Sequence, residues 1–459
     1  MSSWAERARA ILPGGASTGS KRPDALYGAL ADDPTLPTHF SRSQGCRVWD
    51  ATGREYLDCG MALGAVGLGY ADPDVTRAVQ AAVSAGNVST LTHTLEVEVA
   101  EQLVALFPGS EQLRFLRTGA EAGAAAVRVA RAITGREHVL ACGYFGWLDW
   151  NSDAPGVPAA TRELVTWLPF NDSEVLTRAM RDAVEQGRTP AAIVIEPLVH
   201  DIASRAWLQL ARDLATQHGA LLVFDEVKTA FRVRTAGVQS LHGVRPDLTT
   251  LGKAMANGFP LSAIVGPRAV MDAARHTWIS STAASETTGL AAAQAVLARH
   301  AAQDVCAGMA QAGRHMRELI ATALQRAMRR WQDDAGMSQP APTFTALGPD
   351  VMWRLESSEP EMLDLLVAAA ADCGVLLKRG AYQFGALAHD NEALATLASR
   401  LEALPEHLLT RARSRRPHTQ PCLTRHLAVP SCSSTRTRLF PPRAPTTVTC
   451  DAPINPDCR

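Results

Sequence analysis

The stretch Ala220-Leu-Leu-Val-Phe-Asp225-Glu226 decides the fold. Five apolar residues followed directly by two carboxylates are typical of a short strand that is buried on both faces. The same arrangement occurs upstream, where Ala-Ala-Ile-Val-Ile at residues 191–195 is followed by Glu196. Strands of this kind belong to a mostly parallel sheet with helices on both faces, so we expect an α/β fold.

The segments around these strands support that expectation. Apolar residues recur at helical spacing over residues 121–134, 173–186 and 204–218. Further buried strands are expected over residues 137–142 and 247–251. The chain is strongly helical from about residue 286 to 331, and residues 343–355, 361–374 and 392–409 then indicate a smaller α+β unit.

Composition excludes several classes of protein. Hydrophobic residues make up 46% and charged residues 20%, which is ordinary for a folded globular chain. The formal net charge is −1, so no overall basic field would hold nucleic acid or an anionic membrane. No apolar run is long enough to cross a bilayer, and Glu6, Arg7 and Arg9 do not fit a signal peptide. We therefore expect a cytoplasmic protein with no nucleic-acid and no membrane partner.

The last residues differ from the rest. Residues 411–459 contain nine Arg, eight Pro, two Asp and no Lys. They also contain four of the nine cysteines. A segment of this bias predicts a disordered tail.

Polar residues follow three of the expected strands. Glu196 and Asp225 directly follow apolar runs, and Lys253 follows the strand expected over residues 247–251. In a parallel sheet, ligand-contacting residues lie past the carboxyl ends of the strands. A carboxylate and an amine at successive strand ends can therefore face one crevice.

Two common motifs were considered for these residues. The stretch ending at Asp225-Glu226 has the form of a Walker B strand, but Gly252-Lys253 is followed by Ala254, and position 247 is Asp where the phosphate loop requires Gly. Residues 15–19 match a nucleophile elbow, but no strand precedes them. No zinc-binding pattern of Cys and His is present in the sequence, and we predict no metal site.

An ordered set of motifs resembles one family. The motifs are Thr118-Gly-Ala-Glu-Ala122, Val127 to Arg136, Tyr144-Phe-Gly-Trp147, Phe224-Asp-Glu-Val-Lys-Thr-Ala-Phe-Arg232 and Pro246 to Pro260. Together they resemble the class III pyridoxal-phosphate (PLP) aminotransferases, in particular the branch related to glutamate-1-semialdehyde aminomutase. The resemblance runs from about residue 4 to 405. It implies the type I fold of PLP-dependent transferases: a large domain with a seven-stranded, mostly parallel sheet and a smaller α+β domain.

With this resemblance the chain divides into four regions. Residues 1–71 are expected to form an N-terminal arm and part of the small domain, and 72–290 the large PLP-binding domain. Residues 291–410 are expected to form the C-terminal small domain, before the tail at 411–459.

The resemblance also implies roles for particular residues. Lys253 would form the Schiff base with PLP, and Asp225 would hold the proton on the cofactor's ring nitrogen. The phosphate would bind at the helix start formed by Thr118, Gly119 and Ala120. The remaining cofactor contacts implied are Tyr144, which would stack on the ring, Phe145, Asp201, Val227 and, from the neighbouring subunit, Thr282. The last of these implies a homodimer with shared sites.

The sequence departs from the family at several positions. Phe145 stands where His is usual, Ala120 replaces a hydroxyl residue, Asp201 replaces an Asn beside the ring hydroxyl, and Ala230 replaces a frequent Gly. The candidates for contact with the substrate are Lys21, Arg22, Glu196 and Arg379. Lys21, Arg22 or Arg379 could bind a carboxylate of the substrate, but each of these three cations could equally lie on the surface.

The resemblance implies an aminotransferase that moves an amino group from an amino-acid donor to a keto or aldehyde acceptor through a Lys253 Schiff base and pyridoxamine phosphate. Two alternatives stay open. One is an intramolecular aminomutase or racemase on the same scaffold, which makes no keto acid product. The other is a non-catalytic relative that binds PLP or a partner protein, and the departures at Ala120, Phe145 and Asp201 motivate it.

Overall fold

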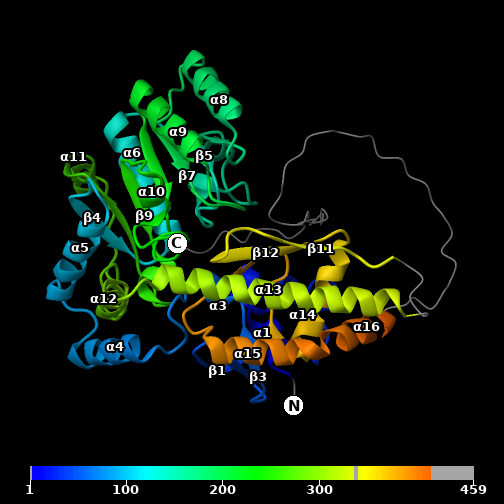
Figure 1. Ribbon diagram of the computed structural model, residues 1–459. Coiled ribbons are helices and arrows are strands. Elements are labelled where there is room, and N and C mark those ends of the chain that lie inside the picture. Colours follow the sequence, from blue (N-terminus) through cyan, green and yellow to red (C-terminus); the bar gives the residue numbers. More distant parts are fainter. Residues whose placement is uncertain (1–2, 335–339, 415–459) are drawn as a thin grey trace, which may run out of the picture. The chain divides into compact units, whose positions relative to one another are not determined.

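The computed structural model describes residues 3–334 and 340–414 (Figure 1). A large sheet with its helices follows the N-terminal segment, and a smaller region contains two further sheets. The order of elements along the chain alternates strands and helices through the middle of the sequence. This is the α/β pattern that the buried apolar runs predict.

The large sheet has seven strands. β10 is antiparallel to both of its neighbours, whereas the other neighbouring pairs are parallel. The prediction of a seven-stranded, mostly parallel sheet is confirmed, and the strands begin one or two residues later than the sequence predicts. In spatial order they are β4 (Gln112–Leu116), β10 (Ser262–Gly266), β9 (Leu248–Leu251), β8 (Leu221–Asp225), β7 (Ala192–Ile195), β5 (Val139–Cys142) and β6 (Val165–Trp167).

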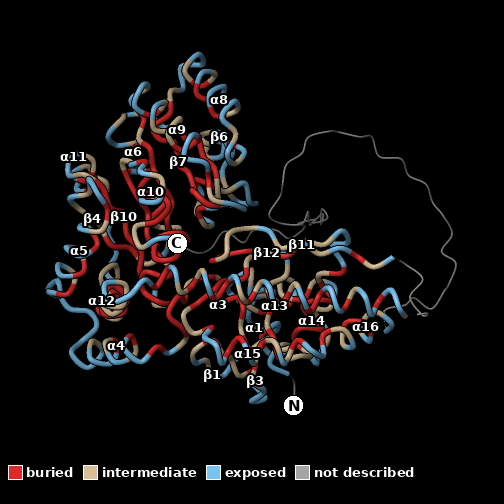
Figure 2. Tube along the Cα trace, viewed as in Figure 1, coloured by how far each residue is buried: buried red, intermediate tan, exposed pale blue. Residues whose placement is uncertain are grey.

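Helices cover this sheet on both faces, as β8 illustrates. Val223 packs in one core cluster with α6 (Gly119–Thr134), whereas Leu222 and Phe224 pack in another with α9 (Arg205–His218). Alternate residues of a strand point to opposite faces, so a strand buried on both sides is apolar throughout. The inner strands β5, β7, β9 and β10 are buried along their length, whereas the edge strands β4 and β6 are not (Figure 2). The other helices of this part include α4 (Pro73–Ala85), α5 (Thr94–Leu106), α8 (Ser173–Glu185) and α12 (Thr287–Ala302).

The smaller region joins segments from both ends of the described chain. β3 pairs in parallel with β13, so residues before 60 and after 370 share one sheet. A core cluster including Leu57, Trp353 and Leu366 lies between its sheets and helices. The strands are β1 (Phe40–Gln44), β2 (Arg47–Asp50), β3 (Glu55–Asp58), β13 (Val375–Leu376), β11 (Phe344–Leu347), β12 (Met352–Ser357) and β14 (Tyr382–Phe384). The helices include α1 (Trp4–Ile11), α13 (Val305–Gln332), α14 (Pro360–Asp372), α15 (Asn391–Arg400) and α16 (Leu404–Ser414).

Two details differ from the sequence prediction. The helical stretch over 286–331 is two helices, because Asp304 accepts a hydrogen bond from Ala307 N–H and caps the start of α13. The division at 290–291 falls inside α12, which packs against α4 and α5. The domain limits otherwise stay a prediction.

The tail is predicted to begin at residue 411, which is before the end of the last described helix. α16 continues to Ser414, because Arg411 pairs with Asp372 at 2.5 Å and with Asp33 at 2.8 Å. Residues 411–414 are therefore helical, and the rest of the predicted tail, 415–459, lies outside the described residues.

The described residues contain neither a membrane-spanning helix nor a cluster of metal ligands. None of their helices combines the length and the apolar character needed to cross a membrane. Within residues 3–334 and 340–414 there is also no group of three or more Asp, Glu, His or Cys side chains that could hold a metal ion.

Candidate active site

Three side chains lie at one edge of the large sheet. Asp225 is the last residue of β8, Glu196 directly follows β7, and Lys253 begins a short 3-10 turn two residues after β9. β7, β8 and β9 are parallel neighbours, so their carboxyl ends meet at the same edge. In the order of the strands, this edge of the sheet therefore carries two carboxylates, Glu196 and Asp225, and then the amine of Lys253.

The backbone that carries Lys253 is held in an unusual conformation. Lys253 has φ of +48°, in the left-handed region that residues with a side chain rarely adopt. Asn257, at the end of the same turn, accepts hydrogen bonds from Gly67 N–H and Leu68 N–H at 3.0 and 2.9 Å and donates one to Gly69 O. These bonds fasten the turn to the segment before α4 and hold Lys253 in place.

Asp225 is a buried carboxylate with few partners. It is 4% exposed, and its Oδ1 accepts one hydrogen bond, from Val227 N–H at 3.0 Å. Burial, together with the nearby charge of Glu196, raises the pKa of Asp225 to about 7. A carboxylate in this position is stabilised by a cationic hydrogen-bond donor, which the protonated ring nitrogen of PLP would be.

Lys253 is an amine without a bonding partner. No hydrogen bond or ion pair to its Nζ occurs within residues 3–334 and 340–414, although Asp225 is near enough to influence its charge. Burial and the positive charge of Lys228 lower the pKa of Lys253, while Glu196 and Asp225 oppose that change. A lower pKa favours the neutral form of the amine, which is the form that attacks a carbonyl carbon.

Val227 lies between two glycines: a Cβ at Gly119 would be 2.8 Å from Val227 Cγ1, and a Cβ at Gly252 would be 3.3 Å from the same atom. The two glycines allow the phosphate loop and the Lys253 turn to approach Val227 closely. A carboxylate, an amine and an apolar seat are what PLP requires, so the residues present fit this cofactor.

The start of α6 provides donors for a phosphate. Thr118 forms a capping box with Glu121, in which Thr118 Oγ1 accepts from Glu121 N–H at 3.2 Å. Within the described part of the chain, the amide N–H groups of Gly119 and Ala120 have no hydrogen-bond partner. Free N–H groups at a helix start bind anions, and the helix dipole favours the same charge.

The loop after β5 separates two aromatic residues that the sequence places together. Tyr144 is 54% exposed, and its N–H donates to Glu196 Oε2 at 3.2 Å. Phe145 is buried and packs against Trp150 in the core beside α6. Gly146 passes so close to Ala120 that a Cβ on the glycine would be 2.3 Å from the Ala120 Cβ. The small side chain at Ala120 is explained by this contact.

Lys228 joins the site, although the sequence analysis did not single it out. Its Nζ lies 2.6 Å from Glu196 Oε1, and the two side chains are only 9% and 6% exposed. The same Nζ lies 4.8 Å from the centre of the Tyr382 ring, and the Tyr382 hydroxyl donates to Val199 O. Its position, three residues after Asp225 at the end of the strand, is the feature of the sequence that could have indicated a place in the site.

In the described chain, no hydrogen bond or ion pair joins the other predicted contacts to this cluster. Asp201 is exposed and accepts a hydrogen bond from the adjacent Ile202 N–H at 2.7 Å. Thr282 and Lys21 are exposed, and Arg22 is half-buried. Arg379 is engaged in an ion pair with the buried Asp364. The roles proposed for these five residues stay predictions.

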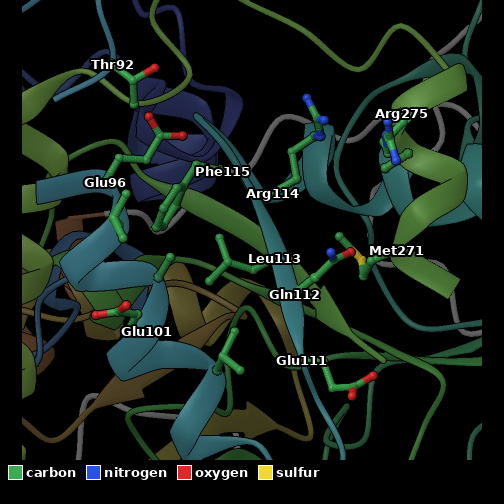
Figure 3. A pocket seen from close by; sticks show the side chains of 14 residues that line it. Thr92, Glu96, Glu101, Glu111, Gln112, Leu113, Arg114, Phe115, Met271 and Arg275 are labelled. Atoms are coloured by element: carbon green, nitrogen blue, oxygen red, sulfur yellow. The ribbon is translucent and has the colours of Figure 1, made fainter. Parts of the chain in front are cut away.

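A separate pocket of about 500 Å³ lies between α5, β4 and residues 271–275 (Figure 3). Glu96 and Glu101 from α5 and Arg114 from β4 line it. Its lining includes none of the predicted cofactor residues, so the pocket is distinct from the site formed by Glu196, Asp225 and Lys253.

Comparisons with known proteins agree with this geometry. The family model of class-III aminotransferases matches residues 27–146 and 147–332. The chain is 37% identical over 317 residues to the 2'-deamino-2'-hydroxyneamine transaminase of Streptomyces kanamyceticus, covering 69% of this chain and 78% of that protein. It is 33% identical over 288 residues to the glutamate-1-semialdehyde 2,1-aminomutase of Methanothrix thermoacetophila, covering 58% of this chain and 63% of that protein.

Among solved structures, the FumI protein of Sphingopyxis sp. MTA144 in its PLP internal aldimine form has a TM-score of 0.80 and 26% identity. The match covers 90% of this chain and 98% of that one. The residues matched by the family model include Asp225 and Lys253. The chain belongs to the class-III aminotransferase family and is a PLP-dependent enzyme.

Proposed function

We propose that this enzyme transfers an amino group from an amino-acid donor to a keto or aldehyde acceptor, with Lys253 as the residue that binds PLP covalently. The observation that carries the proposal is the pairing of an unpartnered amine with a buried carboxylate at neighbouring strand ends. PLP, when bound, supplies a ring that withdraws electrons from the carbon next to the transferred nitrogen.

Lys253 and Asp225 then divide the proton handling. Once its Nζ is free, Lys253 would accept the proton from the donor's α-carbon and would return a proton to the carbon on the other side of the transferred nitrogen. The Asp225 carboxylate keeps a proton on the ring nitrogen by a charge-assisted hydrogen bond, which maintains the ring's pull on electrons.

The surrounding residues bind and orient. The N–H groups of Gly119 and Ala120 would bind the phosphate at the start of α6, with Thr118 fixing that helix start. Tyr144 would cover one face of the ring and Val227 the other, which excludes water from the reacting carbon. Glu196 fixes the Tyr144 backbone, so it is proposed as a positioning residue near the substrate.

Borohydride reduction of the purified protein followed by peptide mapping tests the proposal. The pyridoxyl label is expected on Lys253. A screen of amino donors by mass spectrometry should then detect a keto acid product, and the panel should include the compounds for which the two relatives are named. A label on another residue, or on none, contradicts the proposal.

An intramolecular aminomutase is the second candidate, favoured by the similarity to the glutamate-1-semialdehyde aminomutases. The two candidates differ in products, because an aminomutase returns an isomer and forms no keto acid. Incubation with an amino donor alone, without acceptor, distinguishes them: release of a stoichiometric amount of keto acid supports transfer between two molecules.

We also propose that the active unit is a homodimer with shared sites. Trp147, Trp278 and Leu91 are large apolar side chains exposed at 76%, 90% and 81%. Exposed apolar residues around Tyr144 and Thr282 are typical of a surface covered by a partner. Neither Lys253→Ala nor Thr282→Ala alone should be fully active. Co-expression of the two variants should restore part of the activity if Thr282 acts on the partner's site, and no restoration contradicts shared sites.

A further inference from the structure

We propose that Lys228, held by Glu196 and Tyr382, is a positioning residue that fixes an ammonium group after β8, the strand next to the one that leads to Lys253, and so favours the nucleophilic form of the Lys253 amine. The proposal rests on the function proposed above, because it assigns Lys253 its covalent role. It concerns a side chain to which neither the family resemblance nor the comparisons give a role.

Two residues from different parts of the chain, Glu196 and Tyr382, hold Lys228. Glu196, after β7, contributes an oxygen 2.6 Å from Lys228 Nζ. Tyr382, on β14, presents its ring 4.8 Å away and is itself held by the bond from its hydroxyl to Val199 O. The Glu196 carboxylate is in turn held by Tyr144 N–H. A lysine side chain normally lies in water, so an ammonium that is only 9% exposed and has two held partners is unusual and indicates a specific role.

Lysine is rare in this chain, which makes its use here specific. The sequence has four lysines, at 21, 228, 253 and 378, among 45 basic residues. Arginine is the default cation elsewhere, including in the ion pair of Arg212 with Asp247. A compact ammonium fits beside a ring and a carboxylate in a small space, whereas the planar guanidinium of arginine is larger and presents five donors.

Four charged side chains influence the protonation of Lys253. Lys228 and Arg232 are cationic and disfavour protonation of Lys253, and Asp225 and Glu196 are anionic and favour it. Because the ammonium of Lys228 is fixed, its effect on Lys253 is constant. The negative charge of Glu196 partly offsets the effect of Lys228, so the two charges together determine how strongly protonation of Lys253 is disfavoured.

Competitive acetylation of the four lysines in the cofactor-free full chain tests this directly. Acetic anhydride reacts only with neutral amines, so the extent of labelling of the Lys253 peptide against pH gives the midpoint for that residue. Lys228→Met should move the midpoint to higher pH, because it removes a cation and leaves Glu196 unopposed. Glu196→Gln should move it to lower pH. The double variant should lie between the two.

Controls separate electrostatics from damage to the fold. Arg212→Met removes an ion pair at the opposite ends of β8 and β9 and should leave the Lys253 midpoint unchanged. In the PLP-loaded protein, the pH midpoint of the visible absorbance should move in the same directions. If Lys228→Met alone does not fold, the double variant compared with Glu196→Gln isolates the same effect.

An unchanged midpoint in Lys228→Met, or shifts of the same sign in Lys228→Met and Glu196→Gln, would overturn the proposal. Failure of the proposed function is seen separately, because it appears as a pyridoxyl label away from Lys253, whereas acetylation reports on Lys253 with no cofactor present.

Discussion

The two ends of strands β8 and β9 use charge in opposite ways. At the amino ends, Asp247 pairs with Arg212 at 2.8 Å and accepts a hydrogen bond from Leu222 N–H at 2.7 Å. At the carboxyl ends, Asp225 accepts one backbone hydrogen bond, and no ion pair in the described chain joins it to Lys253. The same two strands therefore carry one satisfied charge cluster and one unsatisfied cluster.

This difference separates stability from function. A satisfied ion pair stabilises the folded chain modestly and needs no ligand. Buried charges that lack partners destabilise the empty site, and a ligand that supplies the missing partners gains that energy on binding. The carboxyl ends of the strands are thus prepared for PLP, and the amino ends are not.

The largest difference between the two ends is expected when the reactive amine is removed. Lys253→Ala should lower kcat by more than about 10⁴-fold, because it removes both the covalent link and the group that moves the proton. Steady-state assay of amino transfer measures the loss. Arg212→Met is the matched control from the other end of the strands and should keep most of the activity. Loss of activity in both variants would show that the two ends are not functionally distinct.

Asp225→Asn tests the carboxylate beneath the ring nitrogen. It keeps the shape of the side chain but removes the charge, so kcat should fall by about 10²–10⁴-fold while PLP still attaches to Lys253. The visible absorbance of the loaded protein reports the attachment, and the assay reports kcat. Full activity in Asp225→Asn would contradict the role of the ring proton.

The raised pKa of Asp225 makes a further prediction for the cofactor-free protein. Its pKa in the folded state, about 7, lies above the ordinary 3.8, so the folded chain binds a proton that the unfolded chain has released between these values. The contribution of Asp225 to stability is therefore full below about pH 4 and is lost as the pH rises to about 7. Thermal unfolding from pH 5 to 8 should show a steeper fall for the wild type than for Asp225→Asn. Equal slopes would mean that Asp225 has an ordinary pKa in the empty site.

The amino-end pair should affect stability alone. Asp247→Asn removes the partner of Arg212 and weakens the bond from Leu222 N–H, which should lower the free energy of unfolding by about 1–3 kcal/mol. Urea unfolding measures this, and kcat measured at 25 °C should change little. A large fall in kcat without loss of stability would contradict the division between the two ends.

Much of this difference between the strand ends could be predicted from the sequence. Strands buried on both faces are continuous apolar runs, so β7 and β8 could be placed within a residue or two, and the first polar residue after each run marks the strand end. Asp225, Glu196 and Lys253 followed from that rule together with the family resemblance. These features depend on local order along the chain.

What the sequence could not show depends on contacts between distant residues. Lys228 meets Tyr382 across more than 150 positions, and no local pattern predicts which ring will lie beside which ammonium. Phe145 follows Tyr144 directly, yet it enters the core against Trp150, because neighbouring side chains of an irregular loop need not share a direction. Arg379 could be named as a cation, but its buried partner Asp364 could not.

The smallest expected effect concerns the space between the two strand ends and the phosphate loop. In Gly119→Ala, the new Cβ would be 2.8 Å from Val227 Cγ1, closer than real side chains allow. The phosphate loop or Val227 must shift, so the affinity for PLP should fall about tenfold, which corresponds to about 1.4 kcal/mol. Fluorescence titration of the cofactor-free protein with PLP measures the change.

Two further variants make that result specific to the seat at Val227. Gly123→Ala lies one turn later on α6, and its Cβ would first meet Trp150 at 3.5 Å, an ordinary contact, so PLP affinity should be kept. Adding Val227→Ala to Gly119→Ala removes the atom that clashes and should recover part of the lost affinity. If Gly119→Ala binds PLP as tightly as the wild type, the close approach of the phosphate loop to Val227 does not shape the site. The carboxyl ends of the strands would then differ from the amino ends in charge alone.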